Sequence, residues 1–242
     1  MRRQAAPVSN GEVCRYDIGV LKFDRVGEAE FRFEEIGEGR FRAVLAAATM
    51  GIAAKLSGHR RQTYQTVMER GPDGKYRPLR FEYERTKKNG SDLDVQVKRY
   101  DFDYQQRLVR YLRIKNGRAG RGAVWSMGEG SAPADFLTGF VNFRSGFYGH
   151  PAPGHPLSLP TFVRGGASEI RIEAAGSGVS KQRDFFRECP GLFRVILDPE
   201  VFDTGGGAVF VCLDGENRLL RGAVENVLGM GDVLGEMRSE QR

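Results

Sequence analysis

Apolar and polar residues alternate along most of the chain. Phe31 and Phe33 alternate with Glu30, Arg32 and Glu34, and the same period of two recurs in many other segments. Successive side chains of a strand point to opposite faces of a sheet, so this pattern predicts strands with one dry and one wet face. Strands of this kind are typical of antiparallel sheets.

The alternation predicts two groups of strands separated by turn signals. The first group covers residues 13–24, 28–36, 40–49, 60–69, 77–86, 92–102, 107–115 and 121–127. The second group covers residues 157–163, 168–174, 179–187, 192–198, 207–213 and 218–228. The dipeptides Asn89-Gly90 and Asn116-Gly117 tolerate positive φ and therefore indicate hairpins. The apolar positions of the strands beside these turns include Val95, Val97 and Leu112.

A meander of this length must curl or close to protect its edges. We therefore predict an all-β fold: a long antiparallel meander curled into a barrel-like or half-barrel sheet, with one central amphipathic helix at about 135–145. Residues 1–12 are expected to be a flexible segment, 13–237 a single β-rich domain and 238–242 a tail. A split into two lobes near 128–156 is the alternative.

The central helix separates the two groups of strands. Asp135 is suited to cap its N-terminus, and Gly146 is suited to end it. Its apolar face is formed by Phe136, Leu137, Phe140 and Val141. Residues 46–56 predict either a second short helix or a strand that bends at Gly51.

Composition and charge exclude several classes of protein. The chain has 242 residues, 40% hydrophobic and 28% charged, which is ordinary for a globular protein. The formal net charge is +6, but basic residues are mixed with acidic ones, and apolar residues interrupt the basic stretch 107–121. We interpret that stretch as a solvated strand face and expect no nucleic-acid partner. No run approaches 18 apolar residues, so we expect no transmembrane segment.

The candidate chemistry is limited. The three cysteines allow at most one internal disulfide, between two of Cys14, Cys189 and Cys212, and the pairing stays open. His150 and His155 lie in a proline-rich loop without a third metal ligand nearby. Serine-nucleophile, phosphate-loop and dinucleotide motifs do not occur in the sequence. We therefore predict no catalytic residue, no metal and no cofactor.

Aromatic and basic residues on neighbouring strands indicate a binding surface on the concave face of the sheet. A curved sheet with a helix across its mouth forms a cavity suited to one elongated ligand. The candidate ligand-binding residues are Arg60, Tyr64, Tyr83, Trp125, Phe140, Asn142 and Arg144. The alternative is that the rings simply form the core. Arg144, if buried, pairs with an acidic strand residue or binds an anionic ligand group.

Several motifs together resemble a known family. They are Tyr16-Asp17, Gly27-Glu28-Ala29, Thr49-x-Gly51, D-F-L-T-G-F-V-N-F-R at 135–144, Gly222-Ala-Val-Glu225 and Gly231-Asp-Val-Leu-Gly235. Over nearly the whole chain, this set resembles the domain of unknown function 3108 family. The helix motif is the most specific part, and Gly139 replaces the alanine that is usual there.

The resemblance implies a β-rich, barrel-like protein of the bacterial periplasm. Because residues 1–10 lack the apolar core of a signal peptide, a signal is then expected to have been removed. The expected function is non-enzymatic binding or carrying of an amphipathic envelope ligand: a lipid, a glycan or a lipoprotein. The alternatives are a structural or protein-interaction module of the envelope, and a hydrolase centred on Asp135, His150 or His155. An apolar cavity above roughly 300 Å³ favours the first function.

Overall fold

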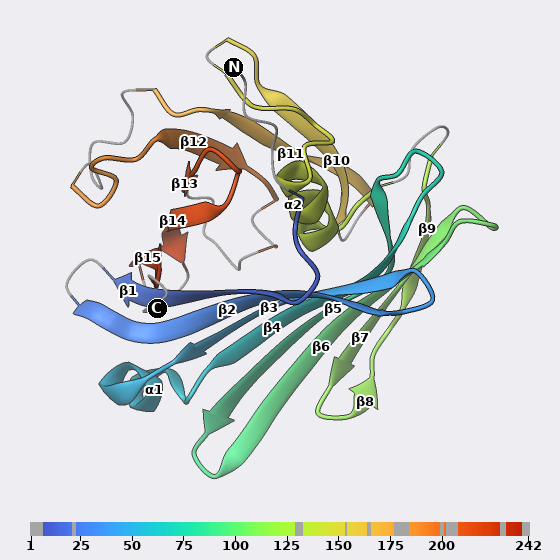
Figure 1. Cartoon of the computed structure of the whole chain (residues 1–242). Coiled ribbons are helices and arrows are strands. Elements are labelled where there is room, and N and C mark those ends of the chain that lie inside the picture. The colour runs from blue at the N-terminus through green and yellow to red at the C-terminus, as the bar shows by residue number, and fades with distance from the viewer. Residues whose placement is uncertain are drawn as a thin grey trace.

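The computed structural model describes most of the chain. The described residues are 7–20, 23–128, 133–152, 154–163, 166–176, 184–198, 201, 208–227 and 231–238. Within them the protein is one large, strongly curved antiparallel sheet that does not close into a barrel, with two helices (Figure 1). This architecture confirms the predicted fold class. Neither described helix is long and apolar enough to cross a membrane.

The strands form two meanders. The first consists of β1 (Glu12–Val20), β2 (Phe23–Gly37), β3 (Arg40–Thr49), β4 (Arg61–Arg70), β5 (Tyr76–Asn89), β6 (Asp92–Asp103), β7 (Leu108–Lys115), β8 (Arg118–Ala119) and β9 (Ala123–Ser126). The second consists of β10 (Leu157–Val163), β11 (Gly166–Ala174), β12 (Gly191–Ile196), β13 (Val209–Leu213), β14 (Leu219–Val227) and β15 (Gly231–Met237).

The two meanders become one sheet because β1 pairs with both β2 and β15. The register of the β1–β15 pair places Ile18 opposite Gly235 and Val20 opposite Val233. The free edges of the sheet are then β10 at one end and β7 with β8 and β9 at the other. The strand β15 has no counterpart among the predicted strands.

Two predicted strands are wrong in part. The single strand expected over 13–24 is two strands, because the chain reverses after Val20 and Val20 pairs with Phe23. The strand expected over 179–187 is not formed at 184–188, where the chain makes turns. Residues 179–183 of that prediction lie outside the described residues.

The two faces of β6 and β7 are the reverse of what the apolar alternation indicates. Buried positions on these strands are Gln96, Tyr100, Phe102, Val109 and Tyr111. Val95, Val97 and Leu112 alternate with these residues and therefore lie on the outer face. Aromatic side chains, which carry more apolar surface than valine, decide which face turns inward.

The helix α2 (Phe136–Arg144) lies inside the curve of the sheet, as predicted (Figure 1). The carboxylate of Asp135 accepts hydrogen bonds from the backbone N–H groups of Leu137 and Thr138, which fulfils the predicted cap. Gly146 follows the C-cap with a φ of 80°, which favours glycine at the end of the helix. The second helix, α1 (Gly51–Ser57), connects β3 to β4, so the helical alternative for 46–56 holds only from Gly51 onward, while residues 46–49 belong to β3.

A disulfide joins Cys189 to Cys212, with the two Cα atoms 5.8 Å apart. It ties the turn at 184–189 to β13 in the second meander. Cys14 on β1 is free and buried. The disulfide closes a loop across a sequence separation of 23 residues and thereby restricts the unfolded chain.

We predict that reducing this disulfide lowers the free energy of unfolding by about 3 kcal/mol, because a loop of this size loses its closure. Chemical denaturation of the oxidised protein and of a Cys189→Ser/Cys212→Ser variant measures the difference. Alkylation of the unfolded, unreduced chain serves as the control and should modify Cys14 alone. Modification of two or three cysteines without reductant would contradict the pairing.

Candidate ligand-binding interior

An apolar cavity of about 220 Å³ lies between α2 and the inner face of the sheet. Both meanders contribute to its walls, so it exists only because β1 joins them. Lining residues from the first meander include Tyr16, Phe31 and Leu45, those from the second include Ile172, Val211 and Leu219, and those from α2 include Phe136 and Phe140. Almost all of the lining is hydrocarbon, which favours an apolar chain over a sugar as the occupant.

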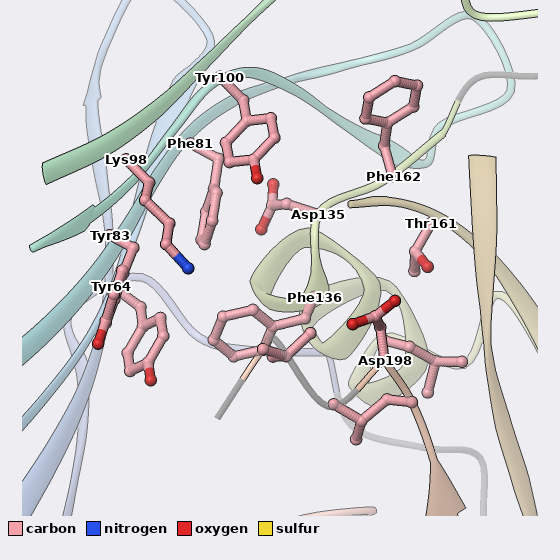
Figure 2. A pocket seen from close by; sticks show the side chains of 13 residues that line it. Tyr64, Phe81, Tyr83, Lys98, Tyr100, Asp135, Phe136, Thr161, Phe162 and Asp198 are labelled. Atoms are coloured by element: carbon pink, nitrogen blue, oxygen red, sulfur yellow. The ribbon is translucent and has the colours of Figure 1, made fainter. Parts of the chain in front are cut away.

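A smaller, more polar pocket of about 50 Å³ adjoins the apolar cavity. Phe136, Ile170 and Leu197 line both spaces, so the two are neighbours. The side chains around the smaller pocket include Tyr64, Phe81, Tyr83, Lys98, Tyr100, Asp135, Phe162 and Asp198 (Figure 2). The interior therefore combines an apolar cavity with a polar end.

Lys98 provides a positive charge in this pocket. Its side chain extends from β6 between the rings of the neighbouring strands toward Phe136 (Figure 2). Its ammonium group lies 5.4 Å from the centroid of the Tyr83 ring, a distance suited to a cation–π contact. Lys98 is not among the candidate residues chosen from the sequence.

A continuous series of aromatic contacts forms the wall of the pocket. Tyr64 stacks on Tyr83 at 4.8 Å between ring centroids, and Phe136 meets Tyr64 edge-on at 5.1 Å. Tyr64 and Tyr83 are thus placed together, as predicted, and both point inward. Rings packed in this way have few alternative rotamers, so the wall is rigid before any ligand arrives.

Trp125 lies at the free edge of the first meander and serves a structural role. Its ring is 5.8 Å from Tyr111 and 5.8 Å from Phe162, which belongs to β10 at the opposite free edge. Phe102 also approaches Phe162, at 6.3 Å. Aromatic packing therefore bridges the gap that backbone hydrogen bonds leave open. Trp125 is not among the residues that line the two spaces.

Asn142 holds α2 to the sheet. Its side-chain oxygen accepts from the backbone N–H of Tyr76 at 2.8 Å, and its amide donates to the carbonyl of Tyr76 at 2.8 Å. Asn142 is 1% exposed, so an apolar replacement would leave both backbone groups without partners. These contacts make Asn142 a structural residue.

Arg144 pairs with Glu12, a residue of β1. The guanidinium donates to the two carboxylate oxygens at 2.6 and 3.4 Å, and 3% of the arginine side chain is exposed. The structure thus shows the ion-pair alternative for Arg144. Burial raises the pKa of Glu12, but the hydrogen bond and the charge of Arg144 outweigh it and hold that pKa below its usual value.

The remaining candidates lie at different places. Phe140 lines the apolar cavity and meets Phe31 edge-on, with the ring centroids 5.4 Å apart. Arg60 lines a separate space of about 120 Å³ together with Thr49 and Gln62, near the start of β4. Tyr64, Tyr83 and Phe140 therefore border the adjoining spaces, whereas Arg60 does not.

Asp135 is 2% exposed, and its hydrogen-bond donors are all uncharged groups. Besides the two backbone N–H groups, the hydroxyls of Thr138 and Thr66 donate to its carboxylate at 2.6 and 2.9 Å. Burial raises the pKa of Asp135 above its usual value, although these hydrogen bonds oppose the shift. Three of the four donors belong to the first turn of α2 and the fourth, Thr66, lies on β4, so the carboxylate holds the helix start against β4.

The histidines do not form a metal site within the described part of the chain. Nδ1 of His150 lies 3.1 Å from the side-chain oxygen of Asn217. No group of three histidine, cysteine or acidic side chains that could hold a metal ion is found among the described residues.

Comparison with known proteins finds a solved structure of similar shape. No family model and no curated protein matches the chain, so the resemblance to the 3108 family has no match to support it. The chain is similar to the crystal structure of a beta-barrel-like protein of the domain of unknown function DUF1849 from Brucella abortus. The two are 11% identical, with 94% of this chain and 95% of that chain covered and a TM-score of 0.47.

We predict that the raised pKa of Asp135 makes stability depend on pH. A raised folded-state pKa means that the folded protein binds the proton more tightly, so stability rises as the pH falls through that pKa. The contribution is fully present below the unfolded pKa, near 4, and is lost as the pH rises through the folded value. Chemical denaturation between pH 4 and 8 should show this dependence in the parent protein relative to Asp135→Asn. Parallel pH profiles for the two proteins would contradict the prediction.

Two substitutions in α2 should lower the free energy of unfolding by different amounts. Leu137 is 1% exposed, so Leu137→Ala should lower the free energy of unfolding by about 2–5 kcal/mol. Phe140 is half-buried and one side of its ring borders the cavity, so Phe140→Ala should cost less than a fully buried phenylalanine, about 1–2 kcal/mol. Urea denaturation of both variants tests this order. A larger loss for Phe140→Ala would mean that the cavity is not open beside that ring.

Proposed function

We propose that this protein is a non-enzymatic periplasmic protein of the cell envelope that binds or carries an amphipathic ligand. The observation that carries the proposal is the apolar cavity beside a pocket that contains Lys98. An apolar chain would fill the cavity and lose its contact with water, while a polar or anionic group of the same molecule would lie near the ammonium of Lys98.

The size of the cavity restricts the ligand. A volume of about 220 Å³ does not reach the roughly 300 Å³ that the sequence analysis set as favouring a carrier and at which pockets for drug-sized molecules begin. It suits part of one narrow hydrocarbon chain better than a fused ring system or a sugar. Of the three expected ligand classes, a lipid or the acyl chain of a lipoprotein therefore fits better than a glycan.

Two observations support a location outside the cytoplasm. Disulfides persist in oxidising compartments such as the bacterial periplasm and are rare in the cytosol, and the Cys189–Cys212 bond is of this kind. The motif resemblance described above also implies an envelope protein. Two of the three residues named for the hydrolase alternative are hydrogen-bonded within the fold: Asp135 by four donors and His150 by Asn217.

Filling the cavity should weaken the binding of an acyl chain. Val211 lines the cavity, and Val211→Phe would place a ring in the free space, so we predict an affinity for palmitate at least tenfold weaker. Val124→Phe is the matched control, because Val124 is 59% exposed on the outer face. Isothermal titration with palmitate measures both variants. Unchanged affinity in Val211→Phe would place the ligand elsewhere.

The charge of Lys98 should distinguish ligands by their polar group. Lys98→Gln should weaken the binding of palmitate about tenfold or more, because a hydrogen bond to a charged group is lost. The same variant should bind hexadecanol as the parent protein does.

Native mass spectrometry of protein purified from its own cells should also show a co-purifying lipid. Bare polypeptide, together with no thermal shift from envelope lipid extracts, would overturn the proposed function.

A further inference from the structure

The helix α1 presents two large apolar side chains to solvent. Ile52 is 77% exposed and Leu56 is 85% exposed, and their spacing of four places them on the same face of the helix. The opposite face is anchored by Ala54, which is 3% exposed. Two exposed apolar side chains next to each other lower the solubility of a protein and add nothing to its core. They therefore indicate a contact with another molecule.

The tip of the β5–β6 hairpin lies directly beside α1. The backbone N–H of Lys88 donates to the carbonyl of Gly58 at 2.6 Å. A Cβ atom at Gly58 would come within 2.3 Å of the carbonyl oxygen of Lys88, so only glycine permits this approach. The hairpin adds a third exposed apolar residue, Leu93, at 57% exposure. Both elements lie at the end of the sheet away from α2 (Figure 1).

Cations accompany these apolar side chains. Lys55 lies on α1 between Ile52 and Leu56. At the hairpin tip Lys88 lies opposite Leu93 and on the same face, and Lys87 lies opposite Asp94 on the other face. In the described part of the chain, none of the three lysines forms an ion pair. Asp92 is the exposed acidic residue at the same tip, and a hydrogen bond joins it to Ser91. The surface therefore carries net positive charge around its apolar centre.

We propose that this surface, which we call the docking tip (Ile52, Lys55, Leu56, Lys87, Lys88 and Leu93), binds the surface of an anionic lipid bilayer. The apolar side chains enter the boundary between headgroups and acyl chains, and the lysines contact the anionic headgroups. Shallow binding of this kind combines buried apolar area with electrostatic attraction. The positive charge favours an anionic membrane over a neutral one.

The interior of the sheet extends toward the docking tip. The space of about 120 Å³ is lined by Ala47, Thr49 and Gln62. Along β3, Leu45 lines the apolar cavity, Ala47 and Thr49 line this second space, and α1 begins two residues later at Gly51. A protein docked through its tip would thus hold one end of its interior against the bilayer. The docking itself does not require a ligand in the cavity, and it goes beyond the proposed function.

Vesicle flotation with the whole protein tests the proposal. We expect binding to vesicles of phosphatidylcholine with 30% phosphatidylglycerol and at least tenfold weaker binding to pure phosphatidylcholine. Ile52→Ser/Leu56→Ser should weaken binding to the anionic vesicles about tenfold or more, because two apolar anchors are lost. Lys87→Glu/Lys88→Glu should weaken it at least 25-fold, or roughly fivefold for each lost lysine charge. Ile36→Ser/Val124→Ser is the matched control, since both residues are exposed elsewhere, and it should bind as the parent protein does.

Three outcomes would overturn the proposal. They are no binding to anionic vesicles, equal binding to neutral and anionic vesicles, and unchanged binding in both sets of tip variants. Light scattering provides a further check: a dimer that Ile52→Ser/Leu56→Ser abolishes would assign the tip to a second copy of the chain instead. All substituted positions are at the surface, so circular dichroism should show the parent fold. Failure here leaves the palmitate titrations unaffected, which keeps the two proposals separable.

Discussion

The backbone pairing of β1 with β15 is the interaction on which the remaining structure depends. It joins two meanders that would otherwise be separate sheets, each with a long exposed edge. Side chains reinforce the joint, because the hydroxyl of Tyr16 on β1 donates to the carbonyl of Leu219 on β14. Once joined, the sheet curves around α2, and apolar residues of both meanders face one interior. The cavity is therefore a product of long-range pairing and belongs to neither meander alone.

Polar residues, together with apolar packing, fix α2 in that interior. Asp135, Asn142 and Arg144 are each 1–2% exposed, and each is hydrogen-bonded to a different strand of the first meander. Buried polar groups cost free energy unless their partners are placed correctly, so they specify one position of the helix. The apolar side chains of α2 are consequently not all required for anchoring. Phe136 and Phe140 can border open space, and this arrangement leaves room for a ligand.

The local pattern of residues was sufficient to predict most of the fold. Alternation and turn dipeptides located the hairpins, and the cap at Asp135 with the stop at Gly146 located α2. The pattern could not show β15, because its glycines weaken the alternation and its partner β1 lies more than 200 residues away. The valines and leucines of β6 and β7 taken alone would indicate the wrong inner face, because tyrosines fill the inside and valines lie outside. Nothing in the local pattern separates Lys98 from the other lysines, and the true partner of Arg144, Glu12, could not be chosen among many acidic residues without the fold.

The pairing of the first strand with the last also has a consequence for how the protein forms. A chain that emerges from a ribosome presents β1 before the other described strands, yet the partner on one side of β1 is β15, the last of these strands. The first meander can assemble early, because its contacts are between neighbours, but its β1 edge stays open until the whole chain is available. Contacts of such large sequence separation are slow to form. The interior is therefore complete only after β15 has paired, and until then the open edge of β1 is exposed to aggregation.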